Sequence, residues 1–489
     1  MAQRMTATTD PTQQRKTFRR RKAQAAARLQ ARQEAECRRV EGLPVTHAHA
    51  AGIDVGSWSH WVCTGADQAR QIREFPAHTD GLHALLAFLQ EQQVDTVALE
   101  STGVYWIPLY ELLEAHGIEV WLVDPSYTKH VRGRPKSDRR DCQWIYRLHS
   151  VGLLAPAFRP DEKTCQLRSY LRQRANLVRY AAQHIQHMQK ALEQMNLKLT
   201  EIISDITGAT GRQIIKAILR GVRDPAKLAK YRDCRCKASA AEIAQALTGS
   251  YRQEHLFALR QALQAWEFYQ QQRDQLDLQI EQQLTRMKQD RALPALPARK
   301  RTYGRKPNEP RFDVRTALYY VVGLDLTEIE GIGEMTALTI ISEIGPEVSK
   351  FATVKRFCSW LGLCPQLKKS GGRVLSSRTR PGVNRAAAAF RIAANSLYAS
   401  KGALGAFLRH KKAHLGAPKA VTATAHKLAR LVYLALKHGL PYVRQTQEEY
   451  EAKVRVQQLK SLKKKARQLG LTVVEPEPAA PTAPAPASR

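Results

Sequence analysis

Residues 131–145 read VRGRPKSDRRDCQWI and place Asp138 and Asp141 three positions apart within a run of five cations. The glycine and the proline predict a loop, and Ser137 is a good N-cap for a helix that continues through Leu148. Residues i and i+3 lie on one face of a helix, so both carboxylates are expected to point the same way. By itself, the stretch also fits a solvated first helical turn whose acids the helix dipole favours.

The composition points to a polyanionic partner. The chain has 489 residues, enough for two to four domains, and 77 Lys and Arg against 44 Asp and Glu give a net charge of +33. Such an excess most often indicates nucleic acid. A membrane surface is the alternative, but no segment approaches the roughly 20 apolar residues that span a bilayer, and the N-terminus has no apolar signal core. The eight cysteines lack zinc-site spacing. We therefore expect reduced thiols in a cytoplasmic, nucleoid-associated protein.

Changes of pattern along the chain predict six regions. Residues 1–45 are a polar, basic arm, which either contacts phosphate as a helix or is a disordered solubilising tail. Residues 294–312 are a Pro-rich basic linker and the clearest boundary. The other regions are an α/β domain at 46–158, helices at 159–293, a C-terminal domain at 313–445, and a tail at 446–489 that is basic at 460–467 and rich in Pro and Ala at 475–489. We expect the end of the tail to be disordered.

Residues 46–158 alternate strand-like and helix-like segments in the order β-β-β-α-β-α-β-α. The first three strands follow one another closely, as in a meander. The expected strands are 51–56, 59–64, 70–75, 95–99 and 118–123, and the expected helices are 79–89, 105–115 and the one that follows Ser137.

Four carboxylates stand out against this pattern. Asp54 lies in the first strand, Glu100 ends the fourth, and Asp138 and Asp141 lie on the helix after the fifth. A lone acid among Val and Ile is costly unless it is paired or binds a metal. Together the four have the layout of a ribonuclease-H-like nuclease, whose carboxylates hold two Mg²⁺ roughly 4 Å apart against a phosphodiester. Any one of them, taken singly, also fits a structural role.

Three motifs resemble the DEDD insertion-sequence transposases: GIDVGS at 52–57, ALESTGVYW at 98–106 and KSDRRD at 136–141. Members of that family have an N-terminal RuvC-like domain and a C-terminal transposase domain with a serine. The likeness runs from about residue 50 to about residue 440. The central sequences DITGATG (205–211) and EHLF (254–257) are similar to a subgroup with a long central region.

The resemblance implies that Asp54, Glu100, Asp138 and Asp141 are the catalytic and metal-binding D, E, D and D. It further implies two Mg²⁺ ions, with Mn²⁺ as a substitute, double-stranded donor and target DNA, and a guide (bridge) RNA encoded beside the gene. We expect the cations around the helical acids to contact phosphate: Arg132, Arg134, Lys136, Arg139 and Arg140.

Residues 159–293 are expected to be helical. Apolar residues recur in steps of three and four over about four heptads, with Arg174 as the only interruption, which predicts a coiled coil. This seam consists of Leu167, Leu171, Val178, Ala181, Ile185, Met188, Leu192, Met195 and Leu199. A second long helix at about 250–290 would pair with it within the chain or between chains, or both would be core helices of a bundle. Between them, the basic stretches 212–230 and 232–237 could touch RNA or DNA.

The C-terminal domain contains IEGIGEMTA at 329–337, which has the shape of a helix-hairpin-helix turn. Gly331 and Gly333 permit a tight turn whose backbone N–H groups would face a phosphate where the next helix starts. An ordinary pair of antiparallel helices is the structural alternative, and the charge of +33 favours contact with DNA. Further helices are expected at 386–398 and 419–438.

Residues 357–372, FCSWLGLCPQLKKSGG, resemble the family's G-L-x-P…S-G signature and put Ser370 at the position of the serine. Lys368 and Lys369 would attract a phosphate and stabilise a pentacovalent transition state. Ser370, in a flexible exposed loop, would attack DNA and form a covalent phosphoserine.

Without the likeness, a serine beside two glycines is usually a turn residue. Ser376 and Ser377 are its local rivals for the role of nucleophile. The stretch RTRPGVN at 378–384 departs from the S-K-x-G-N-like sequence of the family, which puts local contacts in doubt rather than the domain.

The sequence thus predicts an α/β plus α chain: an RNase H-like (RuvC-like) domain, central coiled-coil helices and a mainly helical C-terminal domain. The predicted function is that of an insertion-sequence transposase acting as a homodimer or homotetramer. One alternative is a junction-resolving or RNA-processing nuclease that activates water with its metal, and another is a non-catalytic RNA- or DNA-binding scaffold. An actin-like kinase would suit DVGS at 54–57, but the later glycine-rich nucleotide loops are missing.

Overall fold

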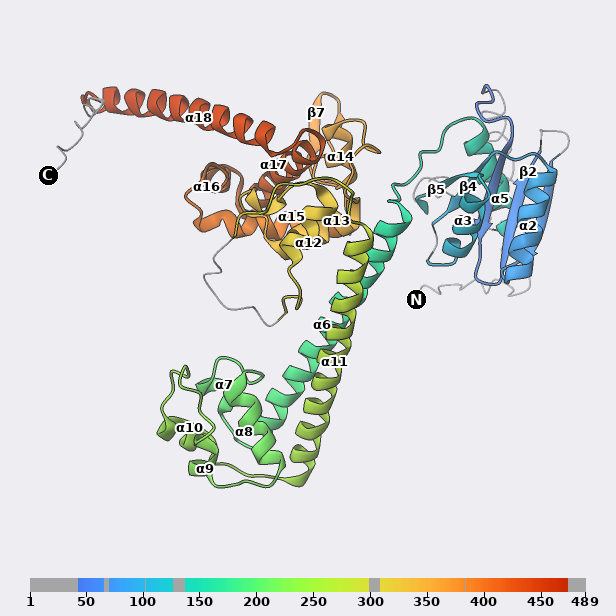
Figure 1. The fold of residues 1–489 in the computed structure, drawn as a ribbon. Coiled ribbons are helices and arrows are strands. Elements are labelled where there is room, and N and C mark those ends of the chain that lie inside the picture. Colours follow the sequence, from blue (N-terminus) through green and yellow to red (C-terminus); the bar gives the residue numbers. More distant parts are fainter. Residues whose placement is uncertain are drawn as a thin grey trace, which may run out of the picture. The chain divides into compact units, whose positions relative to one another are not determined.

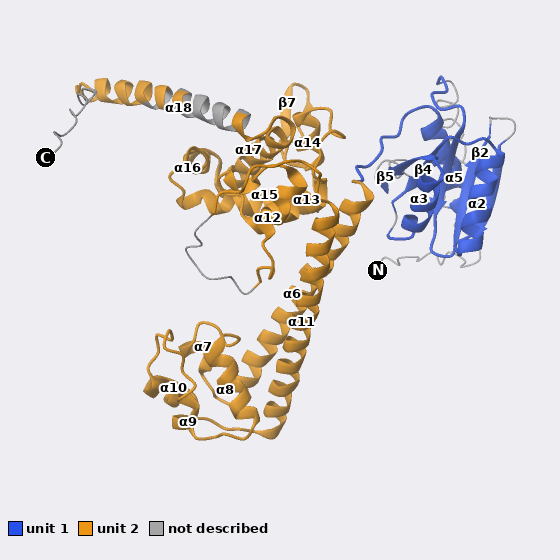
Figure 2. Ribbon diagram, viewed as in Figure 1, with its two compact units in different colours: residues 1–159 blue, residues 160–489 orange. Residues whose placement is uncertain are grey.

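A computed structural model describes residues 43–65, 70–101, 103–125, 137–298, 308–382 and 384–473. Most of the basic arm, the cations Arg132, Arg134 and Lys136, and the Pro/Ala-rich end of the tail lie outside these residues. The chain divides into two compact units, residues 1–159 and residues 160–489 (Figure 2). Within the described ranges, no helix is long and apolar enough to cross a membrane.

The first unit contains a mixed five-stranded sheet in the order β3-β2-β1-β4-β5 (Figure 1). Strands β1, β2 and β3 are antiparallel neighbours, whereas β4 pairs in parallel with β1 and β5. The element order is the predicted one. The strands are β1 (Ala50–Val55), β2 (Ser59–Thr64), β3 (Gln71–Pro76), β4 (Thr96–Glu100) and β5 (Glu119–Val123), and the helices are α2 (Thr79–Glu91), α3 (Trp106–Ala115) and α5 (Asp138–Ser150).

Helices cover both faces of this sheet, which explains why its central strands are almost continuously apolar. On one face, Ile53 of β1 and Leu99 of β4 pack in a core with residues of α2 and α3. On the other face, Ala98 and Val123 pack against Ile145 of α5. Adjacent residues of one strand therefore pack in cores on opposite faces of the sheet.

The second unit is built on two long helices, α6 (Glu162–Gln194) and α11 (Gln253–Arg286), which lie side by side (Figure 1). They are antiparallel, because the Gln283 side chain donates a hydrogen bond to the Lys163 carbonyl at one end, and Tyr180 packs on Tyr269 further along. Of the arrangements left open by the heptad pattern, the structure shows a hairpin within one chain. At 1.5 Å per residue, α6 is about 50 Å long.

A small helical module closes one end of this hairpin, and we call residues 195–252 the tip module. Its helices share a core with the ends of α6 and α11, in which Leu192, Ile214, Ile218 and Leu259 are buried. The helices are α7 (Leu199–Ile202), α8 (Ala209–Leu219), α9 (Pro225–Ala229) and α10 (Ala240–Ala246).

The other end of the hairpin carries the mainly helical C-terminal domain. Its core includes Phe357, Phe390, Leu428 and Val432. The elements are α12 (Val314–Val322), η1 (Leu326–Glu328), α13 (Glu334–Ile344), α14 (Val354–Trp360), β6 (Lys368–Ser370), β7 (Arg373–Ser376), α15 (Arg385–Ser396), η2 (Leu397–Ala399), α16 (Ala403–Leu415) and α17 (Ala417–His438). A further helix, α18 (Leu440–Gln468), contains the basic stretch that the sequence placed in a tail.

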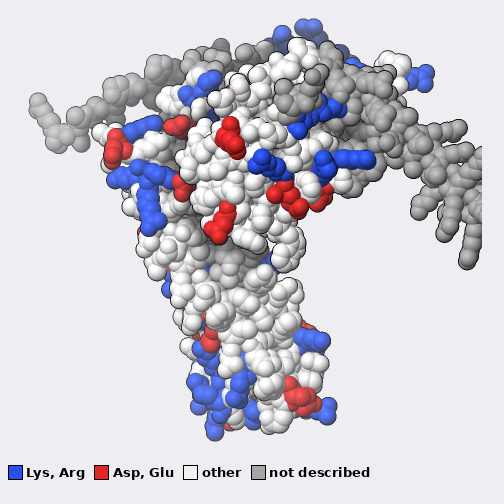
Figure 3. Space-filling model, turned by 90° about the vertical axis from the view of Figure 1, so that its right-hand side faces the viewer, with Lys and Arg blue, Asp and Glu red and all other residues white. Residues whose placement is uncertain are grey.

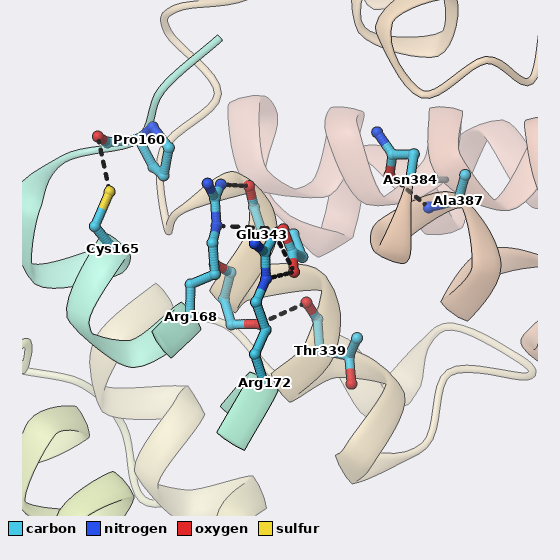
Figure 4. Close-up of polar contacts among 9 residues, drawn as sticks. Pro160, Cys165, Arg168, Arg172, Thr339, Glu343, Asn384 and Ala387 are labelled. Atoms are coloured by element: carbon cyan, nitrogen blue, oxygen red, sulfur yellow. Dashed lines mark hydrogen bonds and ion pairs between the residues drawn. The ribbon is translucent and has the colours of Figure 1, made fainter. Parts of the chain in front are cut away.

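Glu343 joins the C-terminal domain to the hairpin (Figure 4). It lies near the end of α13, its side chain is 9% exposed, and its carboxylate accepts a hydrogen bond from Arg172 at 2.9 Å and forms an ion pair with Arg168 at 3.2 Å. Arg168 also donates to the Glu343 carbonyl at 2.6 Å. Charge-assisted bonds of this kind fix orientation as well as distance, so they hold the domain in a defined position on α6. We call this contact of Arg168 and Arg172 with Glu343 the seat of α13 on α6.

Arg174, the one interruption of the predicted apolar seam, forms a buried ion pair inside the hairpin. Its Nε lies 2.5 Å from Oδ1 of Asp277 on α11, and its Nη2 donates to the Asn308 carbonyl at 3.0 Å. Both side chains are at most 5% exposed. A buried pair adds little net stability, but either partner alone is costly, so the pair favours one register of α6 on α11.

We predict that Arg174→Met destabilises the hairpin by about 3–5 kcal/mol, because Asp277 would remain buried without its counter-charge. The double variant Arg174→Met/Asp277→Leu should recover most of this loss. Denaturant unfolding followed by helical circular dichroism measures both. Equal losses in the single and double variants would contradict the pairing.

Candidate functional site

Asp54 and Glu100 lie at the same edge of the sheet and on the same face. Ile53 of β1 pairs in parallel with Leu99 of β4, so Asp54 and Glu100 are the next residues in register. Because successive side chains of a strand point to opposite faces, and Ile53 and Leu99 face α2 and α3, the two acids face α5. Both are partly exposed.

Helix α5 reaches this face because β1 has a glycine where the two backbones meet. A Cβ atom at Gly52 would lie 2.1 Å from the Tyr146 nitrogen and 2.6 Å from the Cys142 carbonyl oxygen. No side chain fits such a space, so only glycine allows the contact. This role of Gly52 was not predicted from the sequence, where the residue stood only within the GIDVGS motif. A glycine inside an apolar strand is the signal of close backbone approach.

The first turn of α5 carries the other two acids. Ser137 is the N-cap, as predicted, but its side chain makes no capping bond; its carbonyl accepts the Asp141 N–H at 2.9 Å. Asp138 is exposed and Asp141 is partly buried. Burial, followed by the nearby charges that include Asp54 and Asp141, raises the pKa of the Cys142 thiol. The strand acid Asp54 and the helix acid Asp141 therefore act on the same buried group.

The donor chemistry of these four residues suits a hard divalent cation, since all are carboxylates. Their side chains do not form a closed cluster, however. Across the ranges that the structure describes, no three His, Cys, Asp or Glu side chains gather closely enough to hold a metal ion. The backbone thus brings a strand pair and a helix pair of acids to one face of the sheet, and binding would require their side chains to converge.

The predicted phosphate-binding cations can be placed only in part. Arg139 and Arg140 are exposed on the first turn of α5, beside Asp138 and Asp141. Arg132, Arg134 and Lys136 lie in the undescribed stretch before it.

Three further residues at this edge were not among the predicted site residues. Asp124 follows β5 as Glu100 ends β4, and an acid directly after a buried parallel strand was the available signal. Trp58, which is 83% exposed, and Tyr105 lie on the turns that follow β1 and β4. Large exposed aromatic side chains on short turns next to strand acids are the pattern that could have indicated them.

Ser370 lies in a β-hairpin rather than in the expected flexible loop. It ends β6 and pairs with Arg373 of β7 across Gly371 and Gly372, whose φ angles are +53° and +74°. Two left-handed residues in a row are what a tight hairpin turn requires. Ser370, Lys368 and Lys369 are all exposed. Among the contacts of the described residues, the Ser370 hydroxyl has no hydrogen-bond partner, whereas the Ser376 hydroxyl accepts the Arg378 N–H at 3.3 Å.

The two glycines of the predicted helix-hairpin-helix turn differ in surroundings. Gly331, with φ +86°, lies against α15 and η2, where a Cβ would meet Leu397 at 3.0 Å. Gly333 is the N-cap of α13 and opens onto free space. Gly331 is partly exposed and Gly333 is exposed. Further along, Asn384 caps α15 by accepting the Ala387 N–H at 3.0 Å (Figure 4).

Comparison with known families matches both parts of the chain. Residues 51–197 match a model of the DEDD, IS110 type described as a transposase, and residues 325–408 match one described as the transposase IS116/IS110/IS902 family. The first match contains the sheet and all four acids, and the second contains α13 and the hairpin with Ser370. No curated protein matches the chain.

We predict that Gly52→Ala lowers the free energy of unfolding of the first unit by about 3 kcal/mol, because α5 would be forced off β1. Thermal unfolding of the full chain measures the effect. Gly333→Ala, in open space at an N-cap, is the control and should cost about 1 kcal/mol or less. A Gly52→Ala protein as stable as its parent would rule out the close approach.

Proposed function

The chain belongs to the DEDD insertion-sequence transposases, and we propose that it moves its element by cutting and rejoining DNA with metal-binding carboxylates and a serine nucleophile. The observation that carries the proposal is the placement of Asp54 and Glu100, level on one face of the sheet, with α5 and its two acids lying on that face. The strand order of the sheet and the DEDD match both support an RNase H-like, RuvC-like domain.

Asp54, Glu100, Asp138 and Asp141 would hold the divalent metal on which transposases of this type depend. We propose Mg²⁺, as two ions, with Mn²⁺ as a substitute. When bound, such ions stabilise the attacking and leaving oxygens of a phosphodiester. The exposed Arg139 and Arg140 would contact the flanking phosphates.

Ser370 would supply the nucleophile. Its hydroxyl would lose its proton as Oγ forms a bond to phosphorus, while the bond from phosphorus to the leaving deoxyribose oxygen breaks and that oxygen gains a proton. Rejoining is the reverse, with a deoxyribose hydroxyl attacking the phosphoserine. Lys368 and Lys369, exposed in the same strand, would offset the charge that develops on the phosphoryl oxygens.

The acids and the serine belong to different compact units, 229 residues apart from Asp141 to Ser370. We propose that an active site is completed between subunits of a homodimer or homotetramer, with Ser370 of one copy serving the acids of another. The partners would be double-stranded donor and target DNA.

A guide RNA would supply sequence recognition. The net charge of +33 provides a large basic surface, and the sequence has no zinc finger and no clear recognition helix. Delegation of base reading to an RNA explains this combination. The exposed backbone at Gly333, in the turn before α13, would contribute a contact to a nucleic-acid backbone.

A metal-dependent nuclease that uses water is the second candidate, favoured by the absence of a hydrogen-bonded base at the Ser370 hydroxyl within the described contacts. A non-catalytic scaffold is the third; it predicts that Glu100→Gln leaves activity unchanged and that Mg²⁺ has no effect on DNA.

We predict that Ser370→Ala reduces the covalent protein–DNA adduct on denaturing gels by more than about a thousandfold, since the nucleophile is removed. Ser376→Ala is the matched control and should keep the adduct. Asp54→Asn should abolish cleavage through loss of metal binding. Persistent strand cleavage by Ser370→Ala, without adduct, would establish the hydrolytic alternative.

Mixing subunits tests the composite site. Neither Asp54→Asn nor Ser370→Ala protein should cleave alone, whereas their mixture should regain part of the wild-type activity, because some sites would combine intact acids with an intact serine. Strand cleavage is scored on labelled donor DNA. A mixture that stays inactive under conditions in which the wild type cleaves would argue for a site within one chain.

A further inference from the structure

The tip module has a strong and uneven charge. Between residues 206 and 252 the only acids are Asp224, Asp233 and Glu242, against ten Lys and Arg. Figure 3 shows Lys and Arg side chains gathered over the lower end of the molecule, where this module lies. A run of charges is often just a solvated face, so it indicates a ligand site only where the cations lack acidic partners.

The three acids of residues 206–252 are all engaged inside the module; its other two acids, Glu201 and Asp205, precede this stretch. Asp224 caps α9 by accepting the Ala226 N–H at 2.9 Å. Asp233 accepts bonds from the backbone and side chain of Arg235, at 3.0 and 2.9 Å, which lower its pKa. Glu242 closes a capping box with Ser239. These carboxylates hold turns and helix ends, and they compensate few of the cations.

The cations fall into two groups. Five bond to acids or to backbone carbonyls: Lys216, Arg223, Arg232, Arg235 and Arg252. The other five are exposed and, among the described contacts, have no acid within 3.5 Å: Arg212, Arg220, Lys227, Lys230 and Lys237. We call the second group the tip cations. Lys227 is 4.0 Å from Asp224, and Arg212 lies over the Trp266 ring at 6.0 Å.

The fold aligns the tip cations of α8 and α9. Arg212 lies in the first turn of α8 and Arg220 is its C-cap, eight residues or about 12 Å further along the axis, and both are exposed. The chain then reverses at Gly221, and the Asp233 N–H bonds the Thr210 hydroxyl at the start of α8. Lys227 and Lys230 therefore lie on a segment that runs back beside α8.

We propose that the tip module is a second nucleic-acid site, which binds the phosphate backbone of double-stranded DNA through the tip cations. Duplex DNA carries one charge per 1.7 Å, so the 12 Å stripe on α8 spans several phosphates. The exposed side chains of α8 and α9 include no aromatic group on which an unpaired base would stack. On these two helices, this favours a regular duplex over single-stranded RNA; the exposed aromatic side chains next to the module, Phe257 and Phe268, lie on α11. The site is one hairpin length, about 50 Å, from the C-terminal domain.

The test compares two full-length variants with the same loss of charge. One replaces three tip cations by Arg212→Gln, Arg220→Gln and Lys230→Gln. The control replaces three cations that already have acidic partners, by Lys216→Gln, Arg235→Gln and Arg252→Gln. Binding to a labelled DNA duplex of arbitrary sequence is measured by fluorescence anisotropy in EDTA over a range of salt concentrations. The assay involves neither metal nor cleavage, so its outcome is independent of the proposed function.

The tip variant should lose about 2.7 from the slope of log K against log salt, since each lost phosphate contact contributes about 0.9. The control variant should change the slope by less than about 1. Equal slopes for the two variants, or no change in either, would overturn the proposal. A loss confined to a parallel titration with an RNA duplex would reassign the site to RNA and overturn the DNA assignment.

Discussion

The backbone of α5 lies directly on β1 at Gly52, and the arrangement of the α/β unit follows from that contact. Without a Cβ at this position, the helix comes close enough for its first turn to reach the end of the central strand. The face of the sheet on which Asp54 and Glu100 lie is then the face that α5 covers. The placement of four acids on three separate segments depends on one residue that has no side chain.

Much of this unit could be predicted, because its strands alternate or run continuously in hydrophobicity and its acids interrupt that pattern. The hairpin of α6 and α11 was harder to predict from the sequence. Its heptad seam is the same whether the partner helix belongs to the same chain or to another. The residue that fixes the register, Arg174, appears in the sequence only as an interruption, because Asp277 lies 103 positions away.

In the C-terminal domain, a different factor limited the prediction of structure from sequence. KKSGGRVL has few of the residues that favour strands, so the hairpin around Ser370 is specified mainly by two glycines with left-handed conformations. Propensity could not separate it from a loop. Nor could any local pattern relate Ser370 to the acids, since they lie in different compact units of the chain.

The seat of α13 on α6, made by Arg168, Arg172 and Glu343, has a mechanical consequence. It lies near one end of a rod about 50 Å long, and the tip module lies at the other. A tilt of about 10° at the seat would sweep the tip through about 9 Å on a rod of this length. A small change in the geometry of these three side chains would thus be amplified into a large displacement of the tip module.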